Sequence, residues 1–439
     1  MTRIAWLSPL PPQRSGIADY SAALLPHIAA RVSVDVYCEG SPDSVPGVRV
    51  VRPTRRAIGR LDGYDGVVAH IGNSDLHLWI ADAVRRVPTT VVLHEYVIHH
   101  MVAALTIGRG DTDGYLDLMQ DESGRIGRLL GHAVVDGLSA PLWERAADRF
   151  PLTGAVLEQA TSVVCHSRFV AAEVSRRFPE IPVSVVAMHA PAANNTPAER
   201  PAGAGFVVGA FGFITPNKRL PELMRAVSRL SQDIPGAHLL VVGEAPANIN
   251  PLSLAAAAGL RPEQVTVVGY ADAARFDALL RGCDVLVNLR HPTLGETSAT
   301  VVSALALGVP TVVSTGGWYD ELPDDAVGRV PPGEGEVGLL AALLERLATD
   351  PALRERMTIA ARRYVRLRLN PGECADAYLR AALAPGGRDA IQNQLMCRLG
   401  EDIDSLLPTK SRSRNLLTDR LAATLLETGL AKKRRRLRR

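Results

Sequence analysis

The sequence of 439 residues predicts an α/β protein of two doubly wound domains that face each other, followed by a helical, basic C-terminal tail. Short apolar segments of strand length alternate with segments of helical composition, and this alternation occurs twice along the chain. The stretch 191–205, rich in Pro, Ala, Asn and Gly, separates the two series as an interdomain linker would. Because no run of about eighteen apolar residues is present, we expect no membrane-spanning segment.

The first series of alternations predicts an N-terminal domain at residues 1–195. The first expected strand is followed by a proline-rich loop that ends at Gly16, where the absence of a Cβ allows a ligand to approach the backbone. A simple turn explains this glycine equally well. Residues of about 96–150 are predicted to be an insertion in this domain. The expected strands are residues 3–7, 32–37, 66–70, 89–93, 163–165 and 183–188.

The second series predicts a C-terminal domain at residues 206–368, joined to the first by a linker at 196–205. We expect residues 369–384 to form a terminal helix that packs back on the N-terminal domain, and residues 385–439 to form a separate tail. The expected strands are residues 206–211, 238–243, 265–268, 285–289 and 311–314, and the expected helices include residues 221–230, 273–280 and 298–307.

The stretch 290–323 is the most informative part of the sequence. It begins in a loop at the end of a predicted strand and continues into a helix that Gly308 and Pro310 terminate. The carboxyl ends of parallel strands, next to helix N-termini, are where open α/β sheets bind ligands and where backbone N–H groups attract phosphate. Glu296 adds a carboxylate that can accept hydrogen bonds from sugar hydroxyls. A sugar nucleotide has both features, although a simple Thr–Ser helix cap is the alternative.

Composition and charge narrow the class of protein. The five cysteines are far apart and include no CxxC pair, which favours reduced thiols in the cytoplasm over a disulfide framework or a zinc site. The net charge is +3, but the last eight residues carry seven positive side chains, so the rest of the chain has a net charge of −4. The globular part therefore gives no sign of binding nucleic acid.

Several short motifs follow one another along residues 1–384, and the stretch from residue 290 completes the series. Taken together in this order, they resemble the motifs of the family-4 (group 1) glycosyltransferases. This family has the GT-B fold, in which two Rossmann-like domains face each other across a cleft. The motifs are SGIADYS at residues 15–21, LHEY at 93–96, CHSRFVAAEV at 165–174, FGFITPNKRL at 211–220, and VVGE and VVGY ending at Glu244 and Tyr270.

The resemblance implies a retaining glycosyltransferase that moves a hexose-type sugar from a nucleotide-diphosphate sugar to an acceptor. The second domain would bind the donor, and the first would bind the acceptor: a glycan, a lipid-linked glycan or a small molecule. The resemblance also implies that the reaction needs no metal ion and no other cofactor. Two alternatives stay open. One is a protein of the same fold that binds a sugar nucleotide or a glycan without transfer, and the other is a sugar-nucleotide epimerase.

Roles for individual residues follow from the resemblance at matching positions. Lys218 would pair with the donor diphosphate, Glu296 would bind the hydroxyls of the donor sugar, and His94 would contact the sugar from the acceptor side. These three form the predicted catalytic group. The amides of Thr297 and Ser298 would cap the distal phosphate. The predicted donor-binding residues are Gly16, Gly212, Lys218, Arg219, Gly243, Tyr270, Arg290, Gly295, Glu296, Thr297, Ser298 and Ser303.

Three positions depart from the family's pattern. Phe213 stands where members usually have an arginine, five or six positions before the lysine, and Arg219 or Arg290 would supply that charge. Ser303 stands where a second glutamate usually holds the ribose. Counted back from Gly308, the first glutamate of the family's pattern falls on Gly295. Glu296 is one place later, so we assume a one-residue shift in the loop.

Two further segments carry patterns outside this series. Asp111 and Asp113 match the DxD pattern with which some transferases bind a metal ion, but we predict a polar loop of the insertion here. In the tail, leucines at 417, 421 and 425 lie on one face of a predicted helix, and a cationic run follows from Lys432 to Arg439. This combination suits an anionic membrane surface, and a solvated tail or a protein contact explains it equally well. We therefore expect a cytoplasmic protein. If the tail binds the membrane, the protein is peripheral on its inner face.

Overall fold

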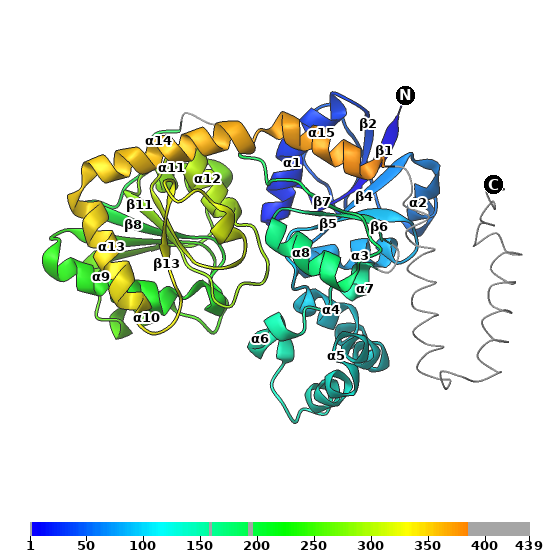
Figure 1. Ribbon diagram of the computed structural model, residues 1–439, viewed down its shortest axis with the longest axis horizontal. Coiled ribbons are helices and arrows are strands. Elements are labelled where there is room, and N and C mark those ends of the chain that lie inside the picture. The colour runs from blue at the N-terminus through cyan, green and yellow to red at the C-terminus, as the bar shows by residue number, and fades with distance from the viewer. Residues whose placement is uncertain (1, 158–159, 192–195, 385–439) are drawn as a thin grey trace, which may run out of the picture.

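The structure is a computed structural model that describes residues 2–157, 160–191 and 196–384 (Figure 1). Two parallel β-sheets lie side by side, one in each domain. The first sheet has the order β3 (Arg49–Val51), β2 (Ser33–Tyr37), β1 (Arg3–Leu7), β4 (Gly66–Ile71), β5 (Thr89–Leu93), β6 (Ala160–Cys165) and β7 (Val183–Val185). The second has the order β10 (Val265–Val268), β9 (Ala237–Val242), β8 (Phe206–Phe211), β11 (Val285–Asn288), β12 (Thr311–Ser314) and β13 (Val327–Val330).

Both sheets follow the same rule of strand order. The first strand of each domain, β1 or β8, is flanked on one side by the next strand in the chain and on the other by β4 or β11. The strand order therefore reverses at that point, and ligands of doubly wound sheets bind at the carboxyl ends of the strands beside such a reversal. The fold class predicted from the sequence, two doubly wound α/β domains, is confirmed.

Helices cover the faces of each sheet, and further helices form the insertion of the first domain (Figure 1). Those of the first domain are α1 (Gly16–Ala29), α2 (Arg55–Ile58), α3 (Leu78–Val84), α4 (His99–Leu105), α5 (Thr112–Val135), α6 (Leu142–Arg145), α7 (Gly154–Leu157) and α8 (Arg168–Arg177). Those of the second are α9 (Leu220–Asp233), α10 (Pro251–Ala257), α11 (Ala273–Arg281), α12 (Ala299–Leu307), α13 (Glu336–Thr349) and α14 (Pro351–Arg368), and α15 (Pro371–Ala382) follows.

The central strands are buried along their whole length because helices cover both faces of a parallel sheet. Every residue of β5, β9 and β12 is buried. The sequence missed two short edge strands, β3 and β13, and the helix α13. β3 has three residues and is largely exposed, and β13 includes a glycine and an arginine, so neither shows the continuous apolar pattern of a buried strand.

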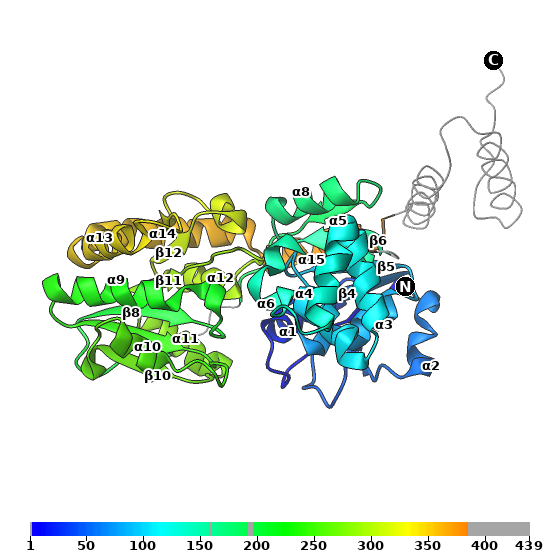
Figure 2. The same cartoon turned by 90° about the horizontal axis from the view of Figure 1, so that it is seen from below.

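The chain crosses back to the first domain at its described end. Figures 1 and 2 show α14 running along the second domain and α15 lying on the first. The hydroxyl groups of Tyr378 on α15 and Tyr20 on α1 are 2.9 Å apart. Ser162 on β6 donates a hydrogen bond to the carbonyl of Ala381 at 3.4 Å. α15 is therefore a structural part of the first domain, although it follows the second in the chain.

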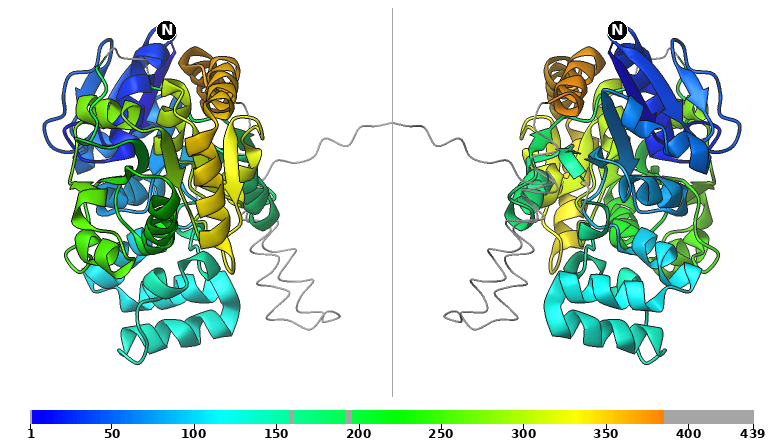
Figure 3. Two further views of the ribbon diagram at one scale, coloured as in Figure 1. Left: turned by 90° about the vertical axis from the view of Figure 1, so that its left-hand side faces the viewer. Right: turned by 90° about the vertical axis from the view of Figure 1, so that its right-hand side faces the viewer.

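The insertion is helical and projects from the first domain (Figures 1 and 3). It contains α4, α5 and α6, and the backbone of α5 is kinked at Ser123 and Gly124. Asp111 accepts a hydrogen bond from the N–H of Gly114 at 2.9 Å, so it caps the start of α5. Among the residues that the structure describes, no helix is long and apolar enough to span a bilayer.

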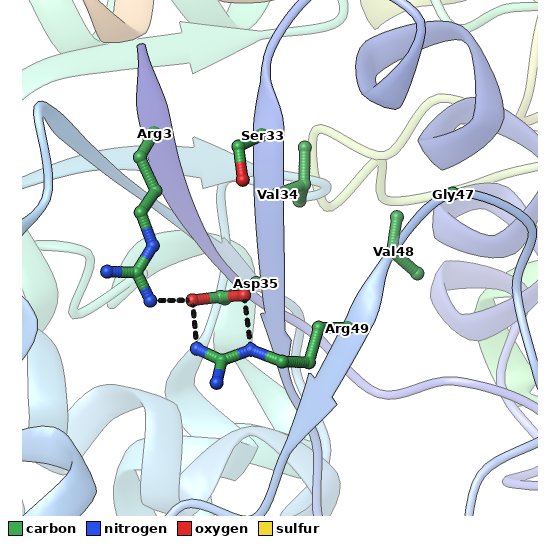
Figure 4. A pocket seen from close by; sticks show the side chains of 7 residues that line it. All are labelled: Arg3, Ser33, Val34, Asp35, Gly47, Val48 and Arg49. Atoms are coloured by element: carbon green, nitrogen blue, oxygen red, sulfur yellow. Dashed lines mark hydrogen bonds and ion pairs between the residues drawn. The ribbon is translucent and has the colours of Figure 1, made fainter. Parts of the chain in front are cut away.

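An open hollow at the amino ends of the first three strands is built for stability (Figure 4). Asp35 on β2 accepts hydrogen bonds from Arg3 on β1, at 2.5 Å, and from Arg49 on β3, at 2.6 and 2.8 Å. Burial raises the pKa of Asp35, but the hydrogen bonds from Arg49, Tyr64 and Arg3 outweigh it and lower the pKa well below its usual range. The carboxylate joins three strands at the edge of the sheet opposite the carboxyl ends.

Candidate active site

Two loops at the carboxyl edge of the second sheet bring the predicted donor-binding residues together. After β8 the chain turns at Gly212, whose φ is +90°, and Lys218 folds back over this turn. A Cβ on residue 212 would lie 2.7 Å from the Lys218 Nζ atom and would displace this side chain, and the positive φ itself favours glycine. Gly212 and Lys218 line one cavity together with Arg290, which lies after β11.

Lys218 is a half-buried cation without a carboxylate partner. Its Nζ donates a long hydrogen bond, 3.4 Å, to the carbonyl of Phe211. Within the described residues no carboxylate oxygen lies at ion-pair distance from it. Burial lowers the pKa of Lys218 well below its ordinary value, and the nearby Arg290 lowers it further, while Glu296 acts in the opposite direction. A negatively charged ligand would supply the missing counter-charge.

Glu296 is held by contacts to both of its carboxylate oxygens. Oε1 lies 2.9 Å from the Arg290 Nε atom, and the two side chains are only 17% and 9% exposed. Oε2 accepts the N–H of Leu294 at 2.7 Å and the hydroxyl of Thr293 at 3.4 Å. The N–H of Arg290 in turn donates to the Ser314 hydroxyl at 2.9 Å. The carboxylate therefore has a fixed position at the end of β11.

The start of α12 carries the hydroxyl residues of the predicted site. Ser298 is the N-cap, and its hydroxyl accepts a hydrogen bond from the N–H of Val301 at 3.3 Å. The cap interpretation of Ser298 is thus confirmed, and its backbone stays at a helix N-terminus, where partial positive charge favours phosphate. The hydroxyl of Thr300 lies 3.5 Å from the point that a Cβ of Gly212 would occupy. Thr300 was not among the predicted residues, because the motif assigned the hydroxyl positions to Thr297 and Ser298.

The loop that carries Glu296 docks on the first domain. The carbonyl of Leu294 accepts hydrogen bonds from the N–H groups of Tyr96 and Val97, each at 3.0 Å, just after β5. The Leu294 side chain packs against the hydrophobic core of the first domain. Gly295, with a φ of +77°, lies so close to Tyr96 that an added Cβ would approach its Cβ to 2.5 Å. These contacts make the glycine necessary at 295.

A second contact between the domains involves Glu321, in the short helix after β12. One carboxylate oxygen accepts the N–H of Phe169 at 2.9 Å, and the other lies 3.3 Å from the Nε atom of Arg168. Both partners belong to the first turn of α8, which Ser167 caps. A carboxylate at a helix N-terminus is favourable because it meets unsatisfied N–H groups and the positive end of the helix dipole.

His94 lies in a chain of three buried histidines at the carboxyl edge of the first sheet. Its Nε2 atom is 2.8 Å from His70 Nδ1, and its Nδ1 atom is 3.2 Å from His166 Nε2. The Nδ1 atom of His166 lies 2.9 Å from the Val186 carbonyl, which can only accept. If all three rings are neutral, the contact with the Val186 carbonyl determines the direction of every hydrogen bond in the chain. His166 donates to the carbonyl, His94 donates to His166, and His70 donates to His94.

His94 has no ring nitrogen left for a ligand in this conformation, whereas the buried Nε2 atom of His70 has no hydrogen-bond partner among the described residues. Burial lowers the pKa of His94 and His70 well below the ordinary value and that of His166 to about 4, so the rings are neutral. His94 is 6% exposed, and both of its ring nitrogens have partners. Its contact with a sugar stays a prediction, and such a contact needs one of these hydrogen bonds to be exchanged.

Three predicted donor residues have larger side chains: Arg219, Arg290 and Tyr270. Arg219 adopts a left-handed backbone and pairs with the buried Glu336, with 2.7 Å between Nε and Oε2, so this guanidinium links α9 to α13 and is not free to replace the missing arginine. Arg290, the other candidate, is paired in the same way with Glu296, so the source of that charge stays a prediction. The ring of Tyr270 is 52% exposed and lies 4.4 Å below the guanidinium carbon of Arg14 from the first domain.

The remaining predictions concern small residues. Gly16 is exposed at the start of α1, with open space beside it. Gly243 follows β9, and a Cβ there would come within 2.3 Å of the Gly212 carbonyl oxygen. Ser303 is half-buried on α12, one turn after Thr300. Among the described residues, no group of three His, Cys, Asp or Glu side chains could hold a metal ion.

The structure adds one titratable group that the sequence noted but did not assign. Glu95 directly follows His94 at the end of β5, and its Oε1 atom accepts the N–H of Asn73 at 2.9 Å. Burial raises the pKa of Glu95 to about 7, the Asn73 N–H opposes that shift, and the negative charge of Glu296 raises it further. The signal in the sequence was the position itself, a carboxylate at the carboxyl end of a buried strand.

Comparison with known proteins shows what this chain is similar to. Residues 195–364 match the model of the family described as glycosyl transferases group 1. Over 184 residues the chain is 32% identical to LpsD of Rhizobium meliloti (strain 1021), described as a lipopolysaccharide core biosynthesis glycosyltransferase. That match covers 41% of this chain and 50% of LpsD, so the chain spans about half the length of this relative.

Solved structures of low sequence identity share the fold. HepE of Anabaena, crystallised with UDP and glucose, is 17% identical, with a TM-score of 0.56 over 87% of this chain and 99% of HepE. Sucrose-phosphate synthase of Thermosynechococcus elongatus is 16% identical, with a TM-score of 0.58 over 92% of this chain and 100% of that chain. WaaG, a glycosyltransferase involved in lipopolysaccharide biosynthesis, is 14% identical, with a TM-score of 0.53 over 85% of this chain and 98% of WaaG. The chain thus has the GT-B fold of these structures, and residues 195–364, which span most of its second domain, are similar to the group 1 glycosyl transferases.

Proposed function

We propose that the protein transfers a sugar from a nucleotide-diphosphate sugar to a sugar or lipid-linked acceptor. The observation that carries this proposal is Lys218, a half-buried cation beside a glycine turn and the N-terminus of α12, with no carboxylate partner among the described residues. A diphosphate fits there, because it brings negative charge to a lysine and to helix N–H groups. The family match and the UDP-bound relative HepE support the same donor class.

The chemistry follows from where charge develops. When the bond between the anomeric carbon and the phosphate oxygen breaks, its electron pair leaves with the phosphate, and the sugar ring becomes positive. Lys218 and the N-terminus of α12 stabilise the leaving diphosphate, a kind of interaction whose removal typically costs about 10²–10³ in rate. Glu296, fixed by Arg290, orients the hydroxyls of the sugar. We further propose a hexose-type sugar and retention of configuration, with the departing phosphate taking the proton of the acceptor on the same face.

The setting of the reaction is part of the proposal. LpsD and WaaG are named for lipopolysaccharide biosynthesis, which supports a glycan or lipid-linked acceptor and a site of action at the inner face of the membrane. The cationic run from Lys432 to Arg439, which lies outside the described residues, would hold the chain there. Sedimentation with anionic liposomes tests this, because removal of these residues should lower the bound fraction at low salt. Because Lys218 supplies the positive charge, we propose transfer without a metal ion or other cofactor.

A second candidate is a sugar-nucleotide-binding protein that does not transfer, or an epimerase. The specific observation in its favour is Ser303, which stands on α12 where a glutamate usually holds the ribose. Product analysis separates the candidates: transfer or donor hydrolysis supports the transferase, whereas an altered sugar nucleotide in the absence of an acceptor supports the epimerase.

The test of the main proposal is a thermal-shift panel of nucleoside diphosphates and their sugars. Binding to the folded state raises the melting temperature by mass action, so a matching donor at 100 times its Kd stabilises by about 2.7 kcal/mol. We expect one base to be preferred and Lys218→Ala to abolish the shift, whereas Arg229→Ala, which removes an exposed cation from α9, should retain it. No shift with any nucleotide would overturn the proposal.

A further inference from the structure

The end of β5 and the loop that carries Glu296 meet where the two domains touch. Tyr96 donates its N–H to the carbonyl of Leu294, and the N–H of Leu294 donates to Glu296. Glu95 immediately precedes Tyr96. Glu95 of the first domain and Glu296 of the second therefore stand on the two segments that meet here, each within two residues of a hydrogen bond between the domains, and their charges influence each other.

Glu95 has a fixed position and one free oxygen. Its Oε1 atom accepts the N–H of Asn73, in the loop after β4, at 2.9 Å. The side chain of Asn73 accepts the N–H of Met101 on α4, also at 2.9 Å, so a second helix holds the loop. Within the described residues Oε2 has no hydrogen-bond partner, and it is not a fully buried atom, because the side chain is only partly covered. The second oxygen is thus available to a ligand.

From the residues that the structure describes, Glu95 does not gain an ion pair that would stabilise the folded protein. The charged groups that face it are Arg290 and Glu296 of the second domain, and Arg290 is already paired with Glu296. Glu95 forms no ion pair of its own in the described part of the chain. A carboxylate that is partly removed from water beside another carboxylate destabilises the fold, and proteins retain such groups at functional sites.

We propose that Glu95 binds the acceptor: its free oxygen accepts a hydrogen bond from the hydroxyl that attacks the donor sugar. This inference rests on the proposed transferase function. In the step, the acceptor oxygen forms the bond to the anomeric carbon, the bond from that carbon to the phosphate breaks, and the hydroxyl proton passes to the departing phosphate. Glu95 orients the hydroxyl and ends the step unchanged.

The pair of carboxylates also defines the acceptor class. Glu95 and Glu296 together favour a neutral polyol or sugar hydroxyl between them, and they repel an acceptor with a phosphate or carboxylate next to the reacting hydroxyl. Because Oε1 accepts the Asn73 N–H, protonation places the hydrogen on the other oxygen, which then becomes a donor, so kcat/KM for the acceptor should fall on acidification through about pH 7, the pKa of Glu95.

The experiment uses Glu95→Gln in the full chain, with Glu180→Gln, an exposed residue of the same domain, as the matched control. We expect Glu95→Gln to keep the thermal shift given by the preferred nucleoside diphosphate, to lower kcat/KM for the acceptor about 10- to 100-fold, and to lose the decline below pH 7. Wild-type kcat/KM and an unchanged pH profile would overturn the proposal.

A second measurement does not depend on transfer. The pKa of Glu95 is raised from its ordinary 4.5 to about 7, so its ionisation destabilises the folded protein as the pH rises between these values. Glu95→Gln should therefore melt at a higher temperature than wild type at pH 8, with the difference much smaller at pH 5. A lower melting temperature at pH 8 would show that the carboxylate serves the fold and would also overturn the proposal. Failure of the proposed function itself is recognised separately, because wild type would then bind no nucleotide.

Discussion

At the carboxyl edge of the first sheet the buried polar side chains are neutral and bonded to one another, whereas at the same edge of the second sheet they are charged. His70, His94 and His166 form a hydrogen-bonded chain. Lys218 has no ionic partner among the described residues, and Arg290 and Glu296 form a pair beside it. One strand order therefore supports two kinds of site, because the loops and not the sheet determine the chemistry.

The difference indicates that the two domains have separate roles in binding. A cationic site with a helix N-terminus suits an anionic donor, and it lies wholly on the second domain. On the side of the first domain the buried side chains are mostly neutral. Glu95 is the exception, because it is a carboxyl group whose pKa responds to Arg290 and Glu296 of the second domain. Substitutions on the two sides should consequently separate donor binding from acceptor use and from stability.

The largest effect is expected from Lys218→Ala on the donor side. Removal of the cation takes away the partner of the diphosphate in the ground state and in the transition state, so we expect turnover to fall by about 10²–10³ and nucleotide affinity to fall with it. Steady-state kinetics and the nucleotide-induced thermal shift measure both. Because the lysine is half-buried without a counter-charge, the variant should be at least as stable as wild type. Turnover close to that of wild type would contradict the donor assignment.

Glu296→Gln should affect the sugar more than the nucleotide. The amide cannot balance the positive charge of Arg290, which is 9% exposed, and it changes the hydrogen bond to the N–H of Leu294. We expect turnover to fall about 100-fold, with the thermal shift by a nucleoside diphosphate without sugar retained. Glu334→Gln, at an exposed position of the same domain, is the control. Equal losses for the diphosphate and for its sugar would place Glu296 outside the sugar site.

Gly295→Ala tests whether contact with the end of β5 holds the loop that carries Glu296 in place. The added Cβ would approach Tyr96 Cβ to 2.5 Å, and a φ of +77° is unfavourable for alanine, so the loop must move away from β5. We expect a loss of about 1–3 kcal/mol of stability and a moderate fall in turnover, with nucleotide binding near that of wild type. Gly63→Ala, where nothing lies near the added Cβ, is the control. An unchanged melting temperature would show that the domains are not held together at this point.

Most of the second domain was predictable, because its strands are continuous apolar segments and its loops carry glycines that the backbone requires. The bounds of β8, β10 and β12 agree with the sequence-based ranges, and Gly212 and Lys218 meet as expected. The sequence could not show which charges find partners across the fold. Arg219 pairs with Glu336, 117 positions away in the chain, and this pairing depends on the packing of α9 against α13.

The first domain was predictable in its strands but not in its site. His94 stood at the expected strand end, yet its two partners come from β4 and from the end of β6, and only the folded sheet brings the three rings together. Glu95 was passed over for the same reason, since a single sequence does not show that Leu294 reaches across to Tyr96.

The smallest expected effect concerns the pH dependence of the histidine chain. Burial lowers the pKa of His166 to about 4, compared with 6.5 for an exposed histidine, and it lowers the pKa of His70 and His94 as well. The unfolded chain therefore takes up protons below about pH 6.5 that the folded chain does not, so stability is retained above that pH and declines towards pH 4. Each such histidine contributes up to about 1.4 kcal/mol per pH unit.

His94→Gln separates this contribution from other acid effects. A glutamine amide can donate to His166 and accept from His70, as the imidazole does, but it does not titrate. We expect a melting temperature near that of wild type at pH 7.5 and a shallower decline between pH 6.5 and 4. An equal decline in both proteins would mean that the ring at position 94 is already protonated in the folded state. The neutral chain, and with it the contrast between the two sheet edges, would then be wrong.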